Sequence, residues 1–400
     1  MPGNGYIIEG IGFMKSNYLA IKDQIIALRR DLHAHPEVEF DLPYTADAIC
    51  AFLDEHGISY QRDIAKSGIC ALIQGDYPGK TLLLRADMDA LPVTEETGLS
   101  FASVHEGNMH ACGHDIHVAT VAAAGVLLHG MRSSLCGNVK LIFQPAEEGV
   151  GGAEPMIAEG IMENPHVDAA LAMHVSPLSP AGVIEVKSGA CMASPDHFYL
   201  TIYGKGTHGA EPQNGINPVA AGAEIVSALY RAVGEVAADE SVFSVCCFNG
   251  GTATNVIPDT AFIGGTFRSF SQEEREQVEQ TMDREISAIC ARYGATYDFN
   301  YVYLYPPVIN HPELTVAFAA SAKKVVGEQG IKWLEKPFML GDDFAYFGKS
   351  VPACYFRGGC APTLPAEPLH SPRFMADENC IEAGALAMVQ FALDFLKNNE

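Results

Sequence analysis

Basic residues are scarce in this chain. Lys and Arg total 25 against 49 Asp and Glu, so the formal net charge is −24. An acidic surface of this strength repels phosphate backbones and anionic lipid headgroups. We therefore expect no nucleic acid and no membrane among the partners of the protein.

Long apolar runs are absent as well. The sequence contains no stretch of eighteen or more apolar residues, the length that a membrane-spanning helix requires. Residues 1–14 hold four glycines but no basic stretch that leads into an apolar one. They do not resemble a secretory signal, and we expect them to form a loose extension.

The cysteines lack a framework spacing. Eleven of them, an odd number, are scattered over 400 residues, and a chain of this length buries enough apolar surface to fold without disulfide bonds. This pattern favours free thiols in the reducing cytosol. We expect a cytoplasmic protein.

The composition is that of a folded protein, with 48% hydrophobic and 18% charged residues. A chain of this length favours two domains, or one large domain with an insertion. Short apolar runs alternate with helical stretches, and these runs are residues 81–84, 139–143, 169–173 and 353–356. Apolar runs separated by helices predict an α/β fold with a mainly parallel sheet flanked by helices.

The middle of the chain has a different pattern. Asn217 followed by Pro218 predicts a helix start, and Ser271 with Glu274 forms a capping-box pattern before a helix that stops at Gly294. With the strands around them, the order is strand–helix–strand–strand–helix–strand, which predicts a ferredoxin-like α+β domain. We expect a catalytic domain in two parts, with an inserted lid domain between them: residues 15–191, 192–305 and 306–400.

The most informative segment is residues 109–117, Met-His-Ala-Cys-Gly-His-Asp-Ile-His. A thiolate and imidazoles are good ligands for divalent ions such as zinc, and Gly113 lets the backbone bend so that its neighbours converge. A lone Cys-x-His pair would more simply be a solvated polar turn before a helix. The local density of His, Cys and Asp favours a metal site.

Three predicted strands end in polar side chains. Asp87 and Asp89 follow the first, the adjacent carboxylates Glu147 and Glu148 follow the second, and His174 follows the third. An acidic loop or a structural histidine would explain any one of them. Because ligands collect at the carboxyl ends of strands in such sheets, their agreement favours one shared site.

The sequence resembles the metal-dependent aminoacylase and carboxypeptidase superfamily. The similar branch is the amidohydrolases that include hippurate hydrolase, indoleacetyl-amino-acid hydrolases and N-acetyldiaminopimelate deacetylase. The resemblance rests on five ordered motifs, which are residues 30–37, 85–92, 109–117, 144–149 and 370–374. The segment Gly341-Asp342-Asp343-Phe344 departs from the more usual Glu-Asp-Phe run.

This resemblance implies residue roles. It makes five side chains the ligands of two divalent ions: Cys112, His114, Glu148, His174 and His370. Among them, Cys112 matches the bridging position. Glu147 matches the general base, and Asp87 matches an acidic residue that supports the site. In the lid, His208 matches a histidine that reaches the active site of a neighbouring subunit. Asn255 and Arg268 match residues that bind the carboxylate of the substrate. A turn residue for His208 and a surface salt bridge for Arg268 remain alternatives.

The resemblance implies a metal-dependent amidohydrolase that cleaves the amide bond of N-acyl amino acids. A dipeptidase or an N-acetyldiaminopimelate deacetylase is the alternative, and a binding or sensor protein without turnover is the non-enzymatic one. The soft thiolate favours zinc, whereas the resemblance points to manganese, with cobalt or nickel as further candidates. The expected partners are a small N-acyl amino acid or dipeptide substrate and a second copy of the chain, bound through the lid domain.

Overall fold

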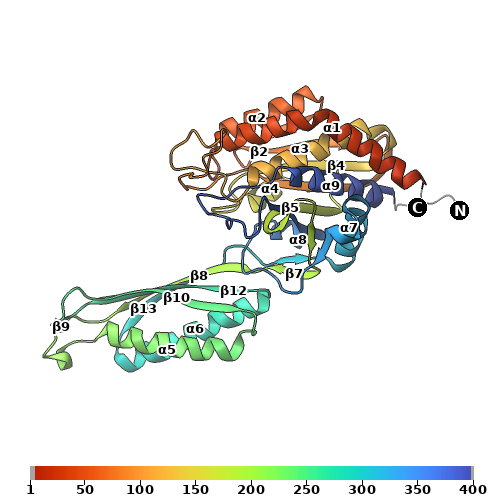
Figure 1. Ribbon diagram of the computed structural model, residues 1–400. Helices are drawn as coiled ribbons and strands as arrows, with labels where there is room; N and C mark the ends of the chain where they lie inside the picture. Colours follow the sequence, from red (N-terminus) through yellow and green to blue (C-terminus); the bar gives the residue numbers. More distant parts are fainter. Residues whose placement is uncertain (1–4, 398–400) are drawn as a thin grey trace. The chain divides into compact units, whose positions relative to one another are not determined.

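The computed structural model describes residues 5–397 and divides into two compact units (Figure 1). The larger unit comprises Met1–Cys191, Ile309–Lys336 and Asp343–Glu400. The smaller unit comprises Met192–Val308 and Pro337–Asp342. The smaller unit thus interrupts the sequence of the larger one.

An eight-stranded sheet forms the centre of the larger unit, in the order β1-β2-β4-β3-β5-β16-β6-β15. Its strands are β1 (Tyr60–Ile64), β2 (Gly68–Gln74), β3 (Tyr77–Asp87), β4 (Cys136–Gln144), β5 (Ala169–Pro180), β6 (Ile184–Val186), β15 (Ile331–Trp333) and β16 (Ala353–Ala361). The four central strands run parallel, and antiparallel strands join at the sides. This sheet, with its flanking helices, confirms the predicted α/β class.

Helices flank this sheet: α1 (Gly5–Ala34), α2 (Pro43–Glu55), α3 (His114–Gly130), α4 (Ala153–Ala158), α7 (Pro312–Val326), α8 (Ala345–Ser350) and α9 (Asn379–Lys397). Helices α3, α7 and α9 pack on the sheet, and α1 packs on α3 (Figure 1). Nearly every residue of α3 is buried. A helix that is apolar on all sides belongs in the core, so α3 carries its first turn into the interior of the unit.

The start of α1 corrects the prediction of a loose extension over residues 1–14. The helix already begins at Gly5, while residues 1–4 lie outside the described part of the chain. Ile11, Met14 and Tyr18 extend the apolar spacing of the helix toward the N-terminus, and Met14 and Tyr18 are buried. A continuous apolar stripe that packs on the core therefore outweighs the helix-weakening glycines.

The smaller unit has a four-stranded antiparallel sheet in the order β10-β12-β8-β13. Its main elements are β8 (Ser194–Tyr203), α5 (Pro218–Val236), β10 (Val242–Asn249), β12 (Thr260–Ser269), α6 (Gln272–Tyr293) and β13 (Thr296–Val302). The side chain of Asn217 caps α5, Ser271 caps α6, and Gly294 ends α6 with a φ of 70°. The capping box is only half formed, because the carboxylate of Glu274 accepts instead from Ala238 and Ser269.

One helix, α9, is long and apolar enough by composition to cross a membrane, within the described part of the chain. Two-thirds of its apolar window, 67%, is buried inside the protein. Its apolar residues pack on α3, α7 and the sheet. This is the environment of a core helix.

Candidate metal centre

The central strands bring three polar segments to one level of the sheet. Asp87, the last residue of β3, pairs in register with Gln144 at the end of β4. On the other side of β3, the pairing with β5 is last seen between Arg85 and Ala172. Asp87 and His174 each lie two residues beyond that pair. The carboxyl ends of parallel strands thus gather these side chains, as their positions in the sequence predict.

Backbone turns at three segments aim side chains inward. Gly113, Ala146 and His370 have φ angles of 80°, 58° and 65°. At Gly113, a Cβ atom would lie 2.7 Å from a methyl group of Val175, so only glycine fits there without a shift. Positive φ values at Ala146 and His370 are unfavourable for residues with a side chain, and such values concentrate at functional sites.

Two groups of three potential ligands share one cysteine. Cys112, His114 and His174 form the first group, and Cys112, Glu148 and His370 form the second. Within each group the ligand atoms lie within 4.8 Å of one another. Cys112 Sγ is 3.3 Å from His174 Nε2, and His370 Nε2 is 3.4 Å from Glu148 Oε1. Atoms that bind one ion at about 2.0–2.3 Å are separated by such distances.

His114 is buried, and its contacts are those of a ligand rather than of a hydrogen-bonded histidine. Neither ring nitrogen has a hydrogen-bond partner among residues 5–397. Its Nε2 atom lies 3.7 Å from a carboxylate oxygen of Glu148 and 3.8 Å from one of Glu147. Its Nδ1 atom lies 3.5 Å from Asp89 Oδ1. Buried polar groups are almost always bonded, so the unbonded Nε2 atom between two carboxylates indicates that a cation belongs there. The donor set therefore fits divalent metal ions.

The pKa values of two of these groups point the same way. Burial opposes protonation of His114, but the carboxylates of Asp87, Asp89 and Glu148 outweigh it and raise the pKa of His114 to about 10. Burial and the Glu148 and Glu147 carboxylates raise the pKa of Cys112 well above its usual value. The carboxylates of the site thus favour a positive charge beside them. A bound metal ion supplies this charge and converts the thiol to a thiolate.

Other bonds orient the proposed ligands. His174 Nδ1 donates to the carbonyl oxygen of Val175 at 2.8 Å, which leaves Nε2 to face Cys112. The two oxygens of Asp89 accept from the backbone N–H groups of Glu147 and Glu148 at 3.0 and 3.1 Å. Such outer bonds fix the tautomer and direction of a ligand.

Asp87 belongs to a further group of potential ligands, with His114 and His117, but both of its oxygens are already bonded. Its carboxylate accepts from Arg85 at 2.5 Å and from His117 at 2.5 Å. Arg85 also donates to Gln144 and to Asp343. Burial would raise the pKa of Asp87, but the positive charges of Arg85 and His114 and the hydrogen bond from His117 lower it well below normal. Asp87 therefore stays ionised at the edge of the site.

The remaining candidate residues lie in the smaller unit. His208, in the short strand β9 (Thr207–His208), pairs with β11 (Val256–Ile257), which follows Asn255 directly. The carbonyl oxygen of Asn255 accepts from Gly209 N at 2.7 Å, and both His208 and Asn255 are exposed. The structure thus brings these two residues together. Arg268 lies on β12 and is half-buried, and burial lowers its pKa against the attraction of Asp196.

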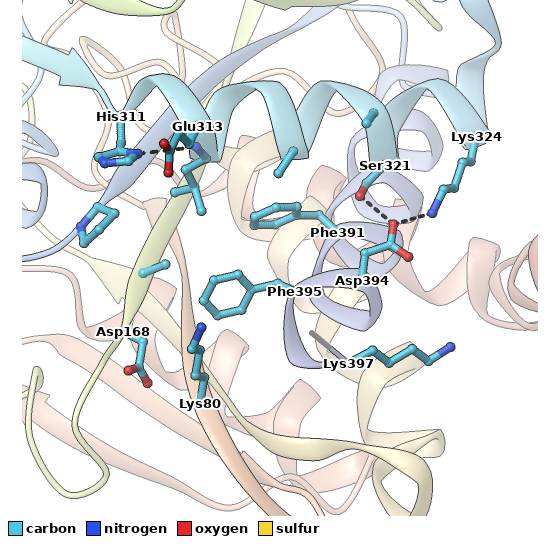
Figure 2. Close-up of a pocket in the computed structure, with 15 residues that line it drawn as sticks. Lys80, Asp168, His311, Glu313, Ser321, Lys324, Phe391, Asp394, Phe395 and Lys397 are labelled. Atoms are coloured by element: carbon cyan, nitrogen blue, oxygen red, sulfur yellow. Dashed lines mark hydrogen bonds and ion pairs between the residues drawn. The ribbon is translucent and has the colours of Figure 1, made fainter. Parts of the chain in front are cut away.

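A large cavity lies at the other end of the same sheet. It measures about 750 Å³ between α7 and α9, and Figure 2 shows Lys80 and Asp168 on its wall together with Phe391 and Phe395. Lys80 precedes Asp87 by seven residues of β3, which is about 23 Å of extended strand. Cavity size alone therefore does not mark the metal centre.

Several residues of the centre carry no role in the sequence prediction. These are Arg85, Asp89, His117 and Asp343. The Asp-x-Asp spacing after β3 is a local signal for Asp89. Arg85 and Asp343 are 258 positions apart in the sequence, and no local sequence pattern predicts their pairing.

Comparison with known proteins identifies the family. The model of the peptidase family M20/M25/M40 matches residues 83–394. The chain belongs to this family. The superfamily resemblance of the five sequence motifs is thereby confirmed.

Relatives of similar length share about a third of their residues with this family member. Thermostable carboxypeptidase 1 of Saccharolobus solfataricus is 36% identical over 96% of this chain and 98% of its own. N-acetylcysteine deacetylase of Bacillus subtilis is 37% identical over 94% of this chain and 98% of its own. N-acyl-L-amino acid amidohydrolase of Geobacillus stearothermophilus is 37% identical over 87% and 95%.

Solved structures agree with the fold. A putative aminohydrolase from methicillin-resistant Staphylococcus aureus superposes with a TM-score of 0.90 at 34% identity, over 96% of this chain and 99% of its own. The YXEP protein of Bacillus subtilis, described as a dinuclear metal-binding peptidase of the M20 family, has a TM-score of 0.82 at 35% identity, over 94% and 99%.

Proposed function

We propose that this protein is a metal-dependent hydrolase that cleaves the amide bond of N-acyl amino acids. The observation that carries the proposal is the pair of ligand groups that share Cys112, with the carboxylate of Glu147 beside them. Two of the relatives described above are named for deacetylation and for hydrolysis of N-acyl amino acids.

Two divalent ions per subunit would occupy the groups formed by Cys112, His114, Glu148, His174 and His370. Cys112 would bridge the ions, because it belongs to both groups. The dinuclear site of the Bacillus subtilis YXEP protein supports this number. When bound, such ions lower the pKa of a water molecule and polarise a carbonyl group. The thiolate favours zinc, and imidazole with carboxylate also suits manganese, cobalt or nickel.

Glu147 is the proposed general base. It is 7% exposed, so it lies near the surface of the site without being open to solvent. Its carboxylate would take a proton from the attacking water and return it to the departing amine. The Asp89 oxygens hold the backbone of Glu147 in place, and the Asp87 carboxylate binds the guanidinium of Arg85 and the ring of His117.

The smaller unit would supply substrate recognition as a lid. Arg268 suits the free carboxylate of an amino acid, because its planar guanidinium can bind both oxygens. Asn255 would add an amide donor. The exposed ring of His208, held by a hydrogen bond from Ala210 N, would reach the site of a second copy in a homodimer formed through the lid.

A peptidase is the second candidate, and the 36% identity to a thermostable carboxypeptidase favours it. A dipeptidase would need an acidic partner for the free amino terminus of its substrate. A deacetylase for N-acetyldiaminopimelate is a further candidate, since a relative of that name is 34% identical. All of them share the metals and the base, and differ only in the group that the pocket accepts.

The experiment that tests the proposal is a product-release screen. Hippurate, N-acetyl amino acids and dipeptides are offered to protein reconstituted separately with each metal ion, with and without a chelator. We expect chelator-sensitive release of free amino acid from the N-acyl substrates. Release from dipeptides alone would favour the peptidase. No hydrolysis of any substrate with any metal would contradict the proposal.

A further inference from the structure

The end of helix α1 carries a motif that the proposed chemistry does not use. Residues 29–33 read Arg-Arg-Asp-Leu-His, and Arg29 and His33 are buried. Positions 29 and 33 are four residues apart and so lie on the same face of the helix. Buried charged groups are usually paired with an opposite charge. The partners of Arg29 and His33 lie on or next to segments that carry the proposed metal ligands.

The first partner is Asp115, in the opening turn of α3. His33 Nδ1 lies 2.7 Å from Asp115 Oδ2, and Arg29 Nε lies 3.0 Å from the same oxygen. Asp115 is buried and directly follows His114 in the sequence. The charged end of α1 therefore holds the turn from which Cys112 and His114 project.

The second partner is the loop that leads into this turn. His33 Nε2 lies 3.3 Å from Glu95 Oε1, and Glu95 also accepts from Ser103 N at 2.6 Å. The ring of Phe101 lies under the guanidinium groups of Arg29 and Arg30, at 4.9 and 4.8 Å. Residues 95–103 of this loop are thereby attached to the end of α1.

The third partner lies after the segment that carries His370. Arg30 binds both oxygens of Glu378, at 2.9 and 2.6 Å, and Arg29 binds one of them at 3.2 Å. The backbone of His370 in turn donates to the carbonyl oxygen of Ala111 at 2.9 Å. The segments of Cys112 and of His370 are thus tied to each other and to α1.

We propose that His33 is a positioning residue for the metal centre: through Asp115 it holds the turn that carries Cys112 and His114. The inference rests on the proposed function, because it assumes that these two residues bind metal. It assigns no ligand or proton-transfer role to His33. Outer partners of metal ligands typically change affinity by about 10- to 100-fold when they are removed.

The experiment measures the affinity of purified protein for Zn²⁺ and Mn²⁺ by competition with a chromogenic chelator, without substrate. We expect His33→Gln to weaken binding at least about 10-fold. Asp115→Asn should weaken it to a similar degree, and the double variant no further, because the two residues act through one contact.

His35→Gln is the matched control. His35 belongs to the same motif and directly follows α1, but its Nδ1 atom bonds the carbonyl oxygen of Asp31 in that helix, at 2.8 Å. Its metal affinity should stay within about twofold of the wild type, well below the loss expected of an outer partner. At saturating metal, turnover of His33→Gln should recover, whereas a general loss of structure would not be restored. Asp115→Asn, which alters the other side of the same contact, decides the question if His33→Gln does not fold.

Two outcomes separate the inference from the proposed function. If the wild type binds no divalent ion, the proposed function fails, and the inference fails with it. If the wild type binds metal and the His33→Gln and Asp115→Asn proteins bind it equally well, only the positioning role is overturned. Additive losses in the double variant would also overturn it.

Discussion

His117 Nδ1 lies 2.5 Å from Asp87 Oδ1, and its other ring nitrogen accepts a hydrogen bond from Val175 N at 2.9 Å. Both nitrogens are therefore occupied, and the tautomer with hydrogen on Nδ1 is fixed. Although His117 is three residues from His114, it has no nitrogen left for a metal. The contact also explains why Asp87 is bonded inward instead of serving as a ligand.

Asp87→Asn should destabilise the protein. The change removes the charge that faces Arg85, whose side chain is buried, and breaking one side of a buried pair costs about 3–5 kcal/mol. Urea denaturation of the metal-free protein measures the loss. Asp76→Asn, at an exposed position, serves as the control. A loss below about 1 kcal/mol, the value of a surface pair, would contradict the burial argument.

Glu147→Gln should keep its metal and lose turnover by about 10²–10⁴-fold, the usual contribution of a general base. The amide is nearly the same size as the carboxylate but takes up no proton. Metal content by elemental analysis and kcat on an N-acyl amino acid give the two readouts. Glu154→Gln, at an exposed carboxylate of α4, should behave as the wild type. Near-normal kcat in Glu147→Gln would remove its role as base.

Cys112→Ala should lower metal occupancy, because one thiolate leaves both ligand groups at once. The control is Cys50→Ala, which removes another buried thiol that lies in the apolar core. Occupancy after gel filtration distinguishes them: the control should keep its metal and lose only about 1 kcal/mol of stability. Full occupancy and full activity in Cys112→Ala would show that this sulfur is not a ligand.

Metal removal should lower thermal stability. Without cations, the buried carboxylates around His114 repel one another. A ligand that binds only the native state stabilises it by about 4 kcal/mol when its concentration is 1,000 times its dissociation constant. Differential scanning fluorimetry with a chelator, then with added Zn²⁺ or Mn²⁺, tests this. The melting temperature should fall with chelator and recover with metal. An unchanged value would contradict a metal site of this affinity.

The contribution of His33 to stability should depend on pH. Burial opposes its charged form, but Asp115 and Glu95 outweigh burial and the repulsion by Arg29, so the pKa of His33 is raised. Nearby His110 is buried and its pKa is lowered to about 3, so it stays neutral. Because the pKa of His33 is higher in the folded than in the unfolded protein, its charged form stabilises the fold. This stabilisation is complete below the unfolded pKa of about 6.5 and is lost as the pH rises through the folded pKa. The difference in unfolding free energy between wild type and His33→Gln should therefore shrink as the pH rises above about 6.5. A difference that grows with pH would contradict the charged His33.

Local patterns in the sequence are enough to predict the central strands, several helix limits and the polar residue types at the strand ends. Apolar runs of strand length predict β3, β4, β5 and β16, and the caps at Asn217, Ser271 and Gly294 predict the helix limits of the smaller unit. These signals are local, because they depend on the period of the side chains and on single backbone conformations. The polar residues at the strand ends follow from the same logic, once a parallel sheet is inferred.

Which of these polar side chains lack a hydrogen bond, and which are bonded to one another, depends on the packing of the folded chain. His114 and His117 lie on the same helix, yet one faces carboxylates without a hydrogen bond and the other is bonded at both nitrogens. The pairings of Arg85 with Asp343 and of His33 with Asp115 join distant parts of the chain. Long-range pairing depends on how whole elements pack, and no local period encodes it. The same reason explains the start of α1, where burial of Met14 and Tyr18 overrides the local preference of the glycines.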